Sequence, residues 1–228
     1  MWFQFKNKMK KATFKRWDLT SLDKAFGLTQ IWKCELLSNW QKMESEITDS
    51  DRETLLMLQA SLIRGGRAWN EVELENKFIS PLIMTARIDD EQMGYFLERP
   101  LAGIVGDYEL SGIVDGIIAM GFRDPDVPFF CMHEYSPLNP PKNGGIEGGE
   151  NQGTPDGQVL AAMLIAREQN NNEKPIYGMY VVGLYWTFIV LEGNKYCVSR
   201  SYNGAIEDIF TIFGMLKALK QIIVRDLM

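Results

Sequence analysis

Two adjacent apolar segments, Ser111–Met120 and Val127–Ser136, place the strongest constraint on how this chain folds. Each carries one acidic residue among apolar neighbours, namely Asp115 and Glu134, and a polar turn over residues 121–126 joins them. Their composition predicts two neighbouring strands. A buried carboxylate is strongly unfavourable unless it is paired, hydrogen-bonded or bound to a metal. Because two adjacent strands can direct Asp115 and Glu134 to a common point, we expect a divalent-metal site there.

Composition limits the class of protein. A chain of 228 residues with 46% hydrophobic residues can form one domain of ordinary size with a substantial core. The net charge of −6 provides no general basic field for nucleic acid, so any such contact must be local. Three widely separated cysteines in or beside apolar runs indicate reduced thiols, and a single histidine excludes a histidine-rich metal site.

No segment of the sequence predicts secretion or a membrane span. The N-terminal residues have their charges after their apolar residues, unlike a secretory signal. The most apolar stretch, Ile176–Leu191, is shorter than the ~20 residues that a spanning helix needs. Its Tyr, Val, Trp and Gly content favours a strand hairpin instead. We therefore expect a cytoplasmic protein that does not enter the membrane.

Residues 1–66 predict an N-terminal helical extension or cap, with residues 67–228 as the main domain. Helices are expected near residues 19–27, over Ile31–Lys42 and over Asp51–Arg64, and Gly65-Gly66 follows the last of them. Residues 1–16 are basic (Lys6, Lys8, Lys10, Lys11, Lys15 and Arg16). We interpret them as a solvated arm; contact with phosphates is the alternative.

The rest of the chain alternates helices and strands. After a helix over Trp69–Ile88 come three strands, a loop over Pro137–Pro155, a helix from Thr154 to about Asn170, a hairpin, a short strand and a final helix over Ala205–Leu227. This order predicts an α/β (α+β) fold with three layers, in which helices flank a central mixed sheet.

Polar residues near these elements extend the expected site. Leu74, Phe78, Ile79 and Leu82 form one apolar face of the first helix, and Glu71 and Glu75 fall within that face. Either acid has a site role, or Glu71 stabilises the helix dipole and Glu75 lies at a rim. Gln158 lies in the first turn of the helix that follows the loop. His133 alternates to the face opposite Glu134, which predicts a packed or surface histidine outside the site.

This ordered set of Glu71, Asp115, Glu134 and Gln158 resembles the restriction-endonuclease-like, or PD-(D/E)XK, nuclease superfamily, over about residues 69–225. That superfamily has an Asp on the second strand of its core, Glu-X-Lys on the third and often an acid on the first helix; one branch adds a Gln on the following helix. The resemblance implies a Mg²⁺- or Mn²⁺-dependent deoxyribonuclease, acting within chains or from their ends. Asp115 and Glu134 would be the metal ligands, and Gln158 would hold the substrate or a metal-bound water.

The sequence departs from this pattern at Ser136, which occupies the position of the motif lysine. A hydroxyl cannot supply the missing positive charge. The superfamily is known for moving this lysine to neighbouring elements, and Lys142 in the loop is the candidate here, ahead of Lys195. Val114 in place of the motif Pro is a common variation.

Three hypotheses remain open from the sequence. The first is an active nuclease whose partner is nucleic acid, DNA being the expected substrate. The second is an inactive protein of the same fold that binds nucleic acid or a protein partner. The third is an interaction or housekeeping domain in which the acids coincide by chance. A homodimer is left open.

Overall fold

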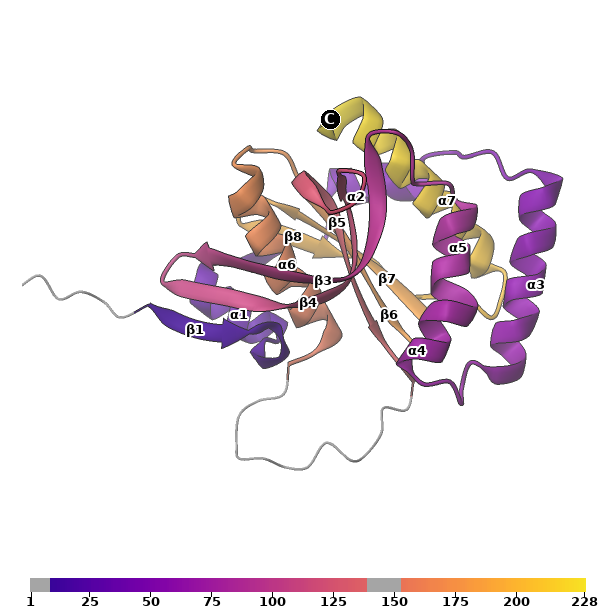
Figure 1. Cartoon of the computed structure of the whole chain (residues 1–228), viewed down its shortest axis with the longest axis horizontal. Coiled ribbons are helices and arrows are strands. Elements are labelled where there is room, and N and C mark those ends of the chain that lie inside the picture. The colour runs from indigo at the N-terminus through magenta and orange to yellow at the C-terminus, as the bar shows by residue number, and fades with distance from the viewer. Residues whose placement is uncertain (1–8, 139–152) are drawn as a thin grey trace, which may run out of the picture.

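A computed structural model describes residues 9–138 and 153–228 of the chain. It is an α/β protein in which helices pack on both faces of a mixed, nine-stranded sheet (Figure 1). Strands follow the order β1-β4-β5-β6-β7-β8-β2, with β3 paired to β4 and β9 paired to β7. The predicted fold class, a mixed sheet flanked by helices, is confirmed.

The sequence predicts a helical extension over residues 1–66, but in the structure this part of the chain contains strands as well as helices. It contains α1 (Leu19–Phe26), α2 (Glu35–Lys42) and α3 (Asp49–Gly65), but also β1 (Lys10–Thr13), η1 (Phe14–Arg16) and β2 (Thr29–Gln30). β1 pairs in parallel with β4, and β2 pairs in parallel with β8. Two strands from residues before 66 therefore belong to the same sheet as the main domain.

The elements after residue 66 follow the predicted order closely. The first helix is continuous but has a wider turn in its middle, so it is divided into α4 (Glu71–Leu74), η2 (Glu75–Ile79) and α5 (Ser80–Thr85). The remaining elements are β3 (Met93–Val105), β4 (Tyr108–Met120), β5 (Asp126–Ser136), α6 (Pro155–Asn170), β6 (Ile176–Val182), β7 (Tyr185–Glu192), β8 (Lys195–Val198), β9 (Tyr202–Asn203), α7 (Asp208–Ile222) and η3 (Ile223–Leu227).

Each face of the sheet has its own apolar core. One core lies between the sheet and α2, α3, α5 and α7, and includes Trp40, Phe78 and Trp186. The other lies beneath α1 and α6 and includes Phe14 and Trp17. The strands contribute side chains to both cores, because successive side chains of a strand point to opposite faces of the sheet. In the described part of the chain, no helix combines the length and the apolar character needed to span a membrane.

A change of partner along β4 positions the site. β3 pairs with β4 along nearly its whole length and so occupies one of its edges. On the other edge, β1 pairs with residues 108–111 and β5 pairs with residues 116–120. Residues 112–115 lie between these two partners, and on this edge of β4 no described strand pairs with them. The sheet therefore opens at Asp115, between the end of β1 and the end of β5.

Candidate active site

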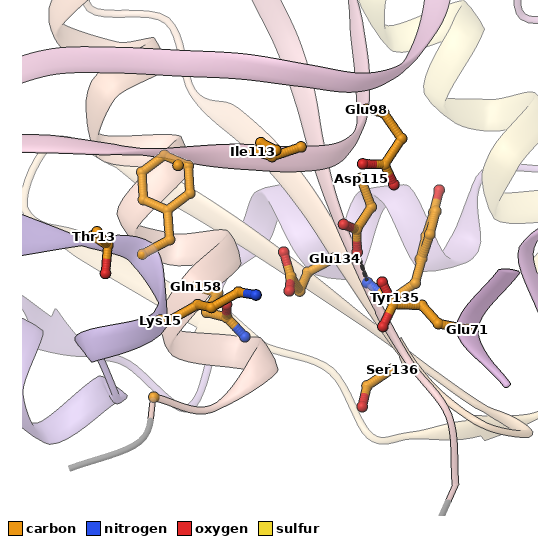
Figure 2. A pocket seen from close by; sticks show the side chains of 13 residues that line it. Thr13, Lys15, Glu71, Glu98, Ile113, Asp115, Glu134, Tyr135, Ser136 and Gln158 are labelled. Carbon is orange, nitrogen blue, oxygen red and sulfur yellow. Dashed lines mark hydrogen bonds between the residues drawn. The ribbon is translucent and has the colours of Figure 1, made fainter. Parts of the chain in front are cut away.

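A cavity of about 480 Å³ occupies this opening in the sheet. β4 contributes Gly112, Ile113 and Asp115, whereas β5 contributes Glu134, Tyr135 and Ser136. The other lining residues come from the start of α4, from β3, from the N-terminal segment and from the start of α6: Glu71, Glu98, Thr13, Phe14, Lys15, Gly153 and Gln158 (Figure 2). The cavity thus collects Glu71, Asp115, Glu134 and Gln158, the four residues in which the sequence resembles a nuclease motif.

Asp115 is held by a backbone hydrogen bond from the neighbouring strand. The Tyr135 N–H donates to Asp115 Oδ2 at 2.5 Å, just beyond the point at which the paired register of β4 and β5 ends. The side chain therefore replaces a carbonyl as the acceptor for this buried N–H. Asp115 is only 9% exposed, and this contact fixes its carboxylate at the cavity wall.

Glu134 and Asp115 influence each other's ionisation. Burial raises the pKa of Glu134 to about 9, and the negative charges of Asp115 and Glu71 add to this shift. Burial also raises the pKa of Asp115 to about 7, against the opposing effect of the Tyr135 N–H. Two neighbouring carboxylates in one buried cavity are unfavourable when both are charged. Binding of a proton or of a cation to them is therefore favoured.

The acid contributed by the first helix is Glu71. It lines the cavity, and burial together with the Glu98 charge raises its pKa. Glu75, the alternative acid, is not among the lining residues. Burial also raises the pKa of Glu75, and its Oε1 is buried without a hydrogen-bond partner in the described part of the chain. The predicted apolar face is confirmed, since Leu74, Phe78, Ile79 and Leu82 are buried.

Glu98 is a fourth acid in the cavity, which the sequence analysis did not identify. It lies on β3 between two residues paired to Val114 and Gly116, and therefore beside Asp115. Its backbone has a left-handed conformation with φ of 50°, which is unusual for a residue other than glycine. This conformation interrupts the alternation of β3, so no periodic pattern in the sequence could have revealed it.

The remaining predicted site residues divide into those inside and those outside the cavity. Gln158 and Ser136 line it. His133 does not: it is fully buried on the opposite face, where its Nδ1 lies 2.8 Å from the Tyr135 hydroxyl. Of the two predicted alternatives, a packed or a surface histidine, the structure shows the packed one. Lys195 is wrong as a candidate cation, because it lines a different cavity with Arg167 and Lys174. Lys142 lies outside the described residues.

Lys15 is a cation of the cavity that the sequence analysis did not assign to the site. The sequence favours a solvated N-terminal arm for residues 1–16, with phosphate contact as the alternative, but the Lys15 side chain extends into the cavity toward Glu134 (Figure 2). Its positive charge acts to lower the pKa of both Glu71 and Glu134, against the larger effect of burial. The alternation of apolar Ala12 and Phe14, both buried, with exposed Lys11 and Thr13 could have predicted a strand just before Lys15, but not the cavity into which the Lys15 side chain extends.

The donor set suits a hard divalent cation that keeps part of its water shell. Within residues 9–138 and 153–228, no group of three or more acidic, His or Cys side chains is arranged to hold a metal ion. Mg²⁺ commonly takes only one or two carboxylates and completes its shell with water and phosphate oxygens. Asp115 and Glu134, two oxygen donors in a cavity with excess negative charge, fit that mode and not a closed protein cage.

Comparison with protein-family models and with curated proteins gives no match to this chain. The chemistry of the cavity is therefore the basis for assigning a function.

Proposed function

We propose that this chain is a metal-dependent nuclease that hydrolyses phosphodiester bonds, with DNA as the expected substrate. The observation that carries the proposal is the meeting of Asp115, Glu134, Glu71 and Gln158 in one cavity. These residues come from two strands and two helices that are far apart in the sequence. Their order along the chain and their residue types resemble the PD-(D/E)XK nuclease superfamily.

Each residue of the cavity has a defined part in this proposal. Asp115 and Glu134 would hold Mg²⁺ or Mn²⁺, which supplies an activated water and neutralises charge on a phosphoryl oxygen when bound. The Tyr135 N–H keeps Asp115 in place, so that its second oxygen is available to a ligand. Gln158, at the start of α6, would orient the substrate or a water through its amide.

The direct test is cleavage of plasmid and linear DNA with Mg²⁺ or Mn²⁺. Wild type should cut DNA, and Asp115→Asn and Glu134→Gln should each lose most of this activity. Asp124→Asn is the matched control, because Asp124 is exposed on the turn between β4 and β5, outside the cavity lining. Equal cutting by wild type and Asp115→Asn would end the proposal.

A second candidate function is nucleic-acid or protein binding without catalysis. Ser136 favours it, because this residue lines the cavity at the position of the motif lysine and carries no charge. Wild type would then bind without cutting, and Ser136→Lys would create cleavage on an otherwise intact scaffold. Cleavage by Ser136→Lys but not by wild type, together with unchanged DNA binding by wild type and Asp115→Asn, would favour the binding function.

A further inference from the structure

We propose that Lys15 supplies the positive charge that Ser136 cannot, by contacting the phosphate during hydrolysis. This inference rests on the proposed nuclease function and deepens it. Five charged side chains line the cavity in the described part of the chain: the acids Glu71, Glu98, Asp115 and Glu134, and the single cation Lys15. Among the described lining residues, Lys15 is therefore the one positively charged group that an anionic substrate in this cavity could contact.

The segment that carries Lys15 is fixed to the two elements that form the site. Phe14 is buried so closely against Gly112 of β4 that a Cβ atom there would lie 2.2 Å from its ring. On the other side, the Gly153 N–H donates to the Lys15 carbonyl at 2.7 Å, and the Thr154 N–H donates to the Trp17 carbonyl at 3.0 Å. The Lys15 backbone is thus held between β4 and the start of α6.

The Lys15 side chain remains available to a ligand. The ion pairs of the described residues do not include it, whereas Lys11 pairs with Glu109 and Lys217 pairs with Asp51. Figure 2 shows that Lys15 and Gln158 approach from one side of the cavity, across from Asp115 and Glu98, with Glu134 between them. A phosphate bound there would lie between the carboxylates and the ammonium group.

The charge that develops during hydrolysis explains why a lysine side chain held at a fixed position would increase the rate. The oxygen of a water bonds to phosphorus, and a cavity carboxylate takes the proton that this water loses. The bond from phosphorus to the leaving oxygen then breaks, and the leaving oxygen takes a proton from solvent. Negative charge rises on the non-bridging oxygens in the transition state, and a preorganised ammonium stabilises that charge more than it stabilises the substrate.

The test compares Lys15→Met with variants that retain a positive charge. Lys15→Met should lower kcat on the order of 10²-fold, the size expected for loss of one preorganised charge contact, with little change in KM. Lys11→Met, whose exposed lysine lies on the preceding strand, should cut like wild type. Lys15→Arg, or Ser136→Lys added to Lys15→Met, should recover a large part of the lost rate.

A second readout does not require activity. If Lys15 projects into the cavity, Lys15→Met should raise the pKa of Glu134 measured by carbon-13 NMR, whereas Lys11→Met should leave it unchanged. An unchanged Glu134 pKa in Lys15→Met would overturn the placement on which the proposal depends.

The cleavage results separate the two proposals. Full activity in Lys15→Met beside an inactive Asp115→Asn would overturn the role of Lys15 and leave the nuclease function standing. Loss of cleavage in Lys15→Met without recovery in either charged variant would also overturn it, since a structural role gives that result. Equal cutting by wild type and Asp115→Asn would remove the nuclease function, and the role of Lys15 with it.

Discussion

Ionisation of Asp115 and Glu134 is opposed by the cavity in which both side chains lie. Burial raises the pKa of both groups, so the folded state holds their protons more tightly than the unfolded state does. The stability that follows is fully present below the unfolded pKa of about 4. It is lost as pH rises through about 7 for Asp115 and about 9 for Glu134. Metal-free protein should therefore become less stable toward alkaline pH through these two groups.

Glu134→Gln should stabilise the metal-free protein at about pH 8, because the variant has no charge to bury. Each pH unit over which a group is ionised only in the unfolded state changes the free energy of unfolding by about 1.4 kcal/mol. The gain should disappear near pH 4, where both states are protonated. Urea unfolding followed by tryptophan fluorescence, with EDTA present, measures this difference.

Glu53→Gln on the exposed face of α3 is the matched control, and should show no such dependence on pH. Buried His133 acts in the opposite sense, because burial lowers its pKa to about 3 and its contribution to stability falls in acid. That effect is common to wild type and Glu134→Gln and cancels in the comparison. A Glu134→Gln variant that is less stable than wild type at pH 8 would show that the Glu134 charge is already compensated.

At the scale of elements, two glycines allow the N-terminal segment to reach the site. Gly112 on β4 faces the ring of Phe14, and Gly157 on α6 lies against the backbone of Trp17, where a Cβ atom would be 2.3 Å from its carbonyl oxygen. Any larger side chain at either position would push residues 14–17 away. The placement of Lys15 in the cavity, on the side of Glu134, thus depends on two glycines that carry no chemistry themselves.

Gly112→Ala should lower the free energy of unfolding by about 1–3 kcal/mol, because the added methyl group overlaps the Phe14 ring. DNA cleavage should fall as well, since Lys15 moves with Phe14. Thermal unfolding and cleavage assays measure both effects. Gly214→Ala is the control: this glycine lies in α7 with open space around it, and alanine there should stabilise by up to about 1 kcal/mol. Equal behaviour of the two variants would contradict the close packing of the N-terminal segment.

The sequence predicted the elements well where hydrophobic periodicity is strong. The predicted strand Ser111–Met120 lies within the observed β4, Tyr108–Met120, and the predicted hairpin over Ile176–Leu191 corresponds to β6, Ile176–Val182, and β7, Tyr185–Glu192. The sequence also indicated Asp115 and Glu134, because each is a single acid within the apolar run of its strand, β4 or β5. The N-terminal strands were not predicted, because β1 has four residues and β2 has two, and the lysines of β1 favoured a solvated arm. Lys15 and Glu98 reach the site through tertiary packing and a left-handed backbone, which local patterns do not encode.

For the whole molecule, the charge balance differs from the basic surface that is usual in DNA-binding proteins, and the proposed function must account for it. The chain has a net charge of −6, and the cavity places four carboxylates against one lysine. A polyanion should therefore be repelled from the site unless a cation offsets part of that charge. Binding and cleavage would then both depend on the divalent ion.

DNA affinity should rise with Mg²⁺ concentration in wild type, and less so in the Asp115→Asn, Glu134→Gln double variant, whose cavity carries less charge. Fluorescence anisotropy with a labelled duplex, at constant ionic strength, measures this dependence. Repeating the measurement with Ca²⁺ in place of Mg²⁺ tests whether DNA binding can be observed without cleavage. Strong binding by wild type in EDTA would contradict the inhibitory role of the cavity charge and favour a basic surface elsewhere.

The binding of Mn²⁺ followed by electron paramagnetic resonance tests most directly whether Asp115 and Glu134 share one cation. Wild type should bind one Mn²⁺ ion more tightly at pH 8 than at pH 6, because protons compete for the two carboxylates. Asp115→Asn and Glu134→Gln should each weaken this binding by at least about tenfold. Asp124→Asn should bind like wild type. Equal Mn²⁺ affinity in wild type and both cavity variants would contradict a metal site between β4 and β5.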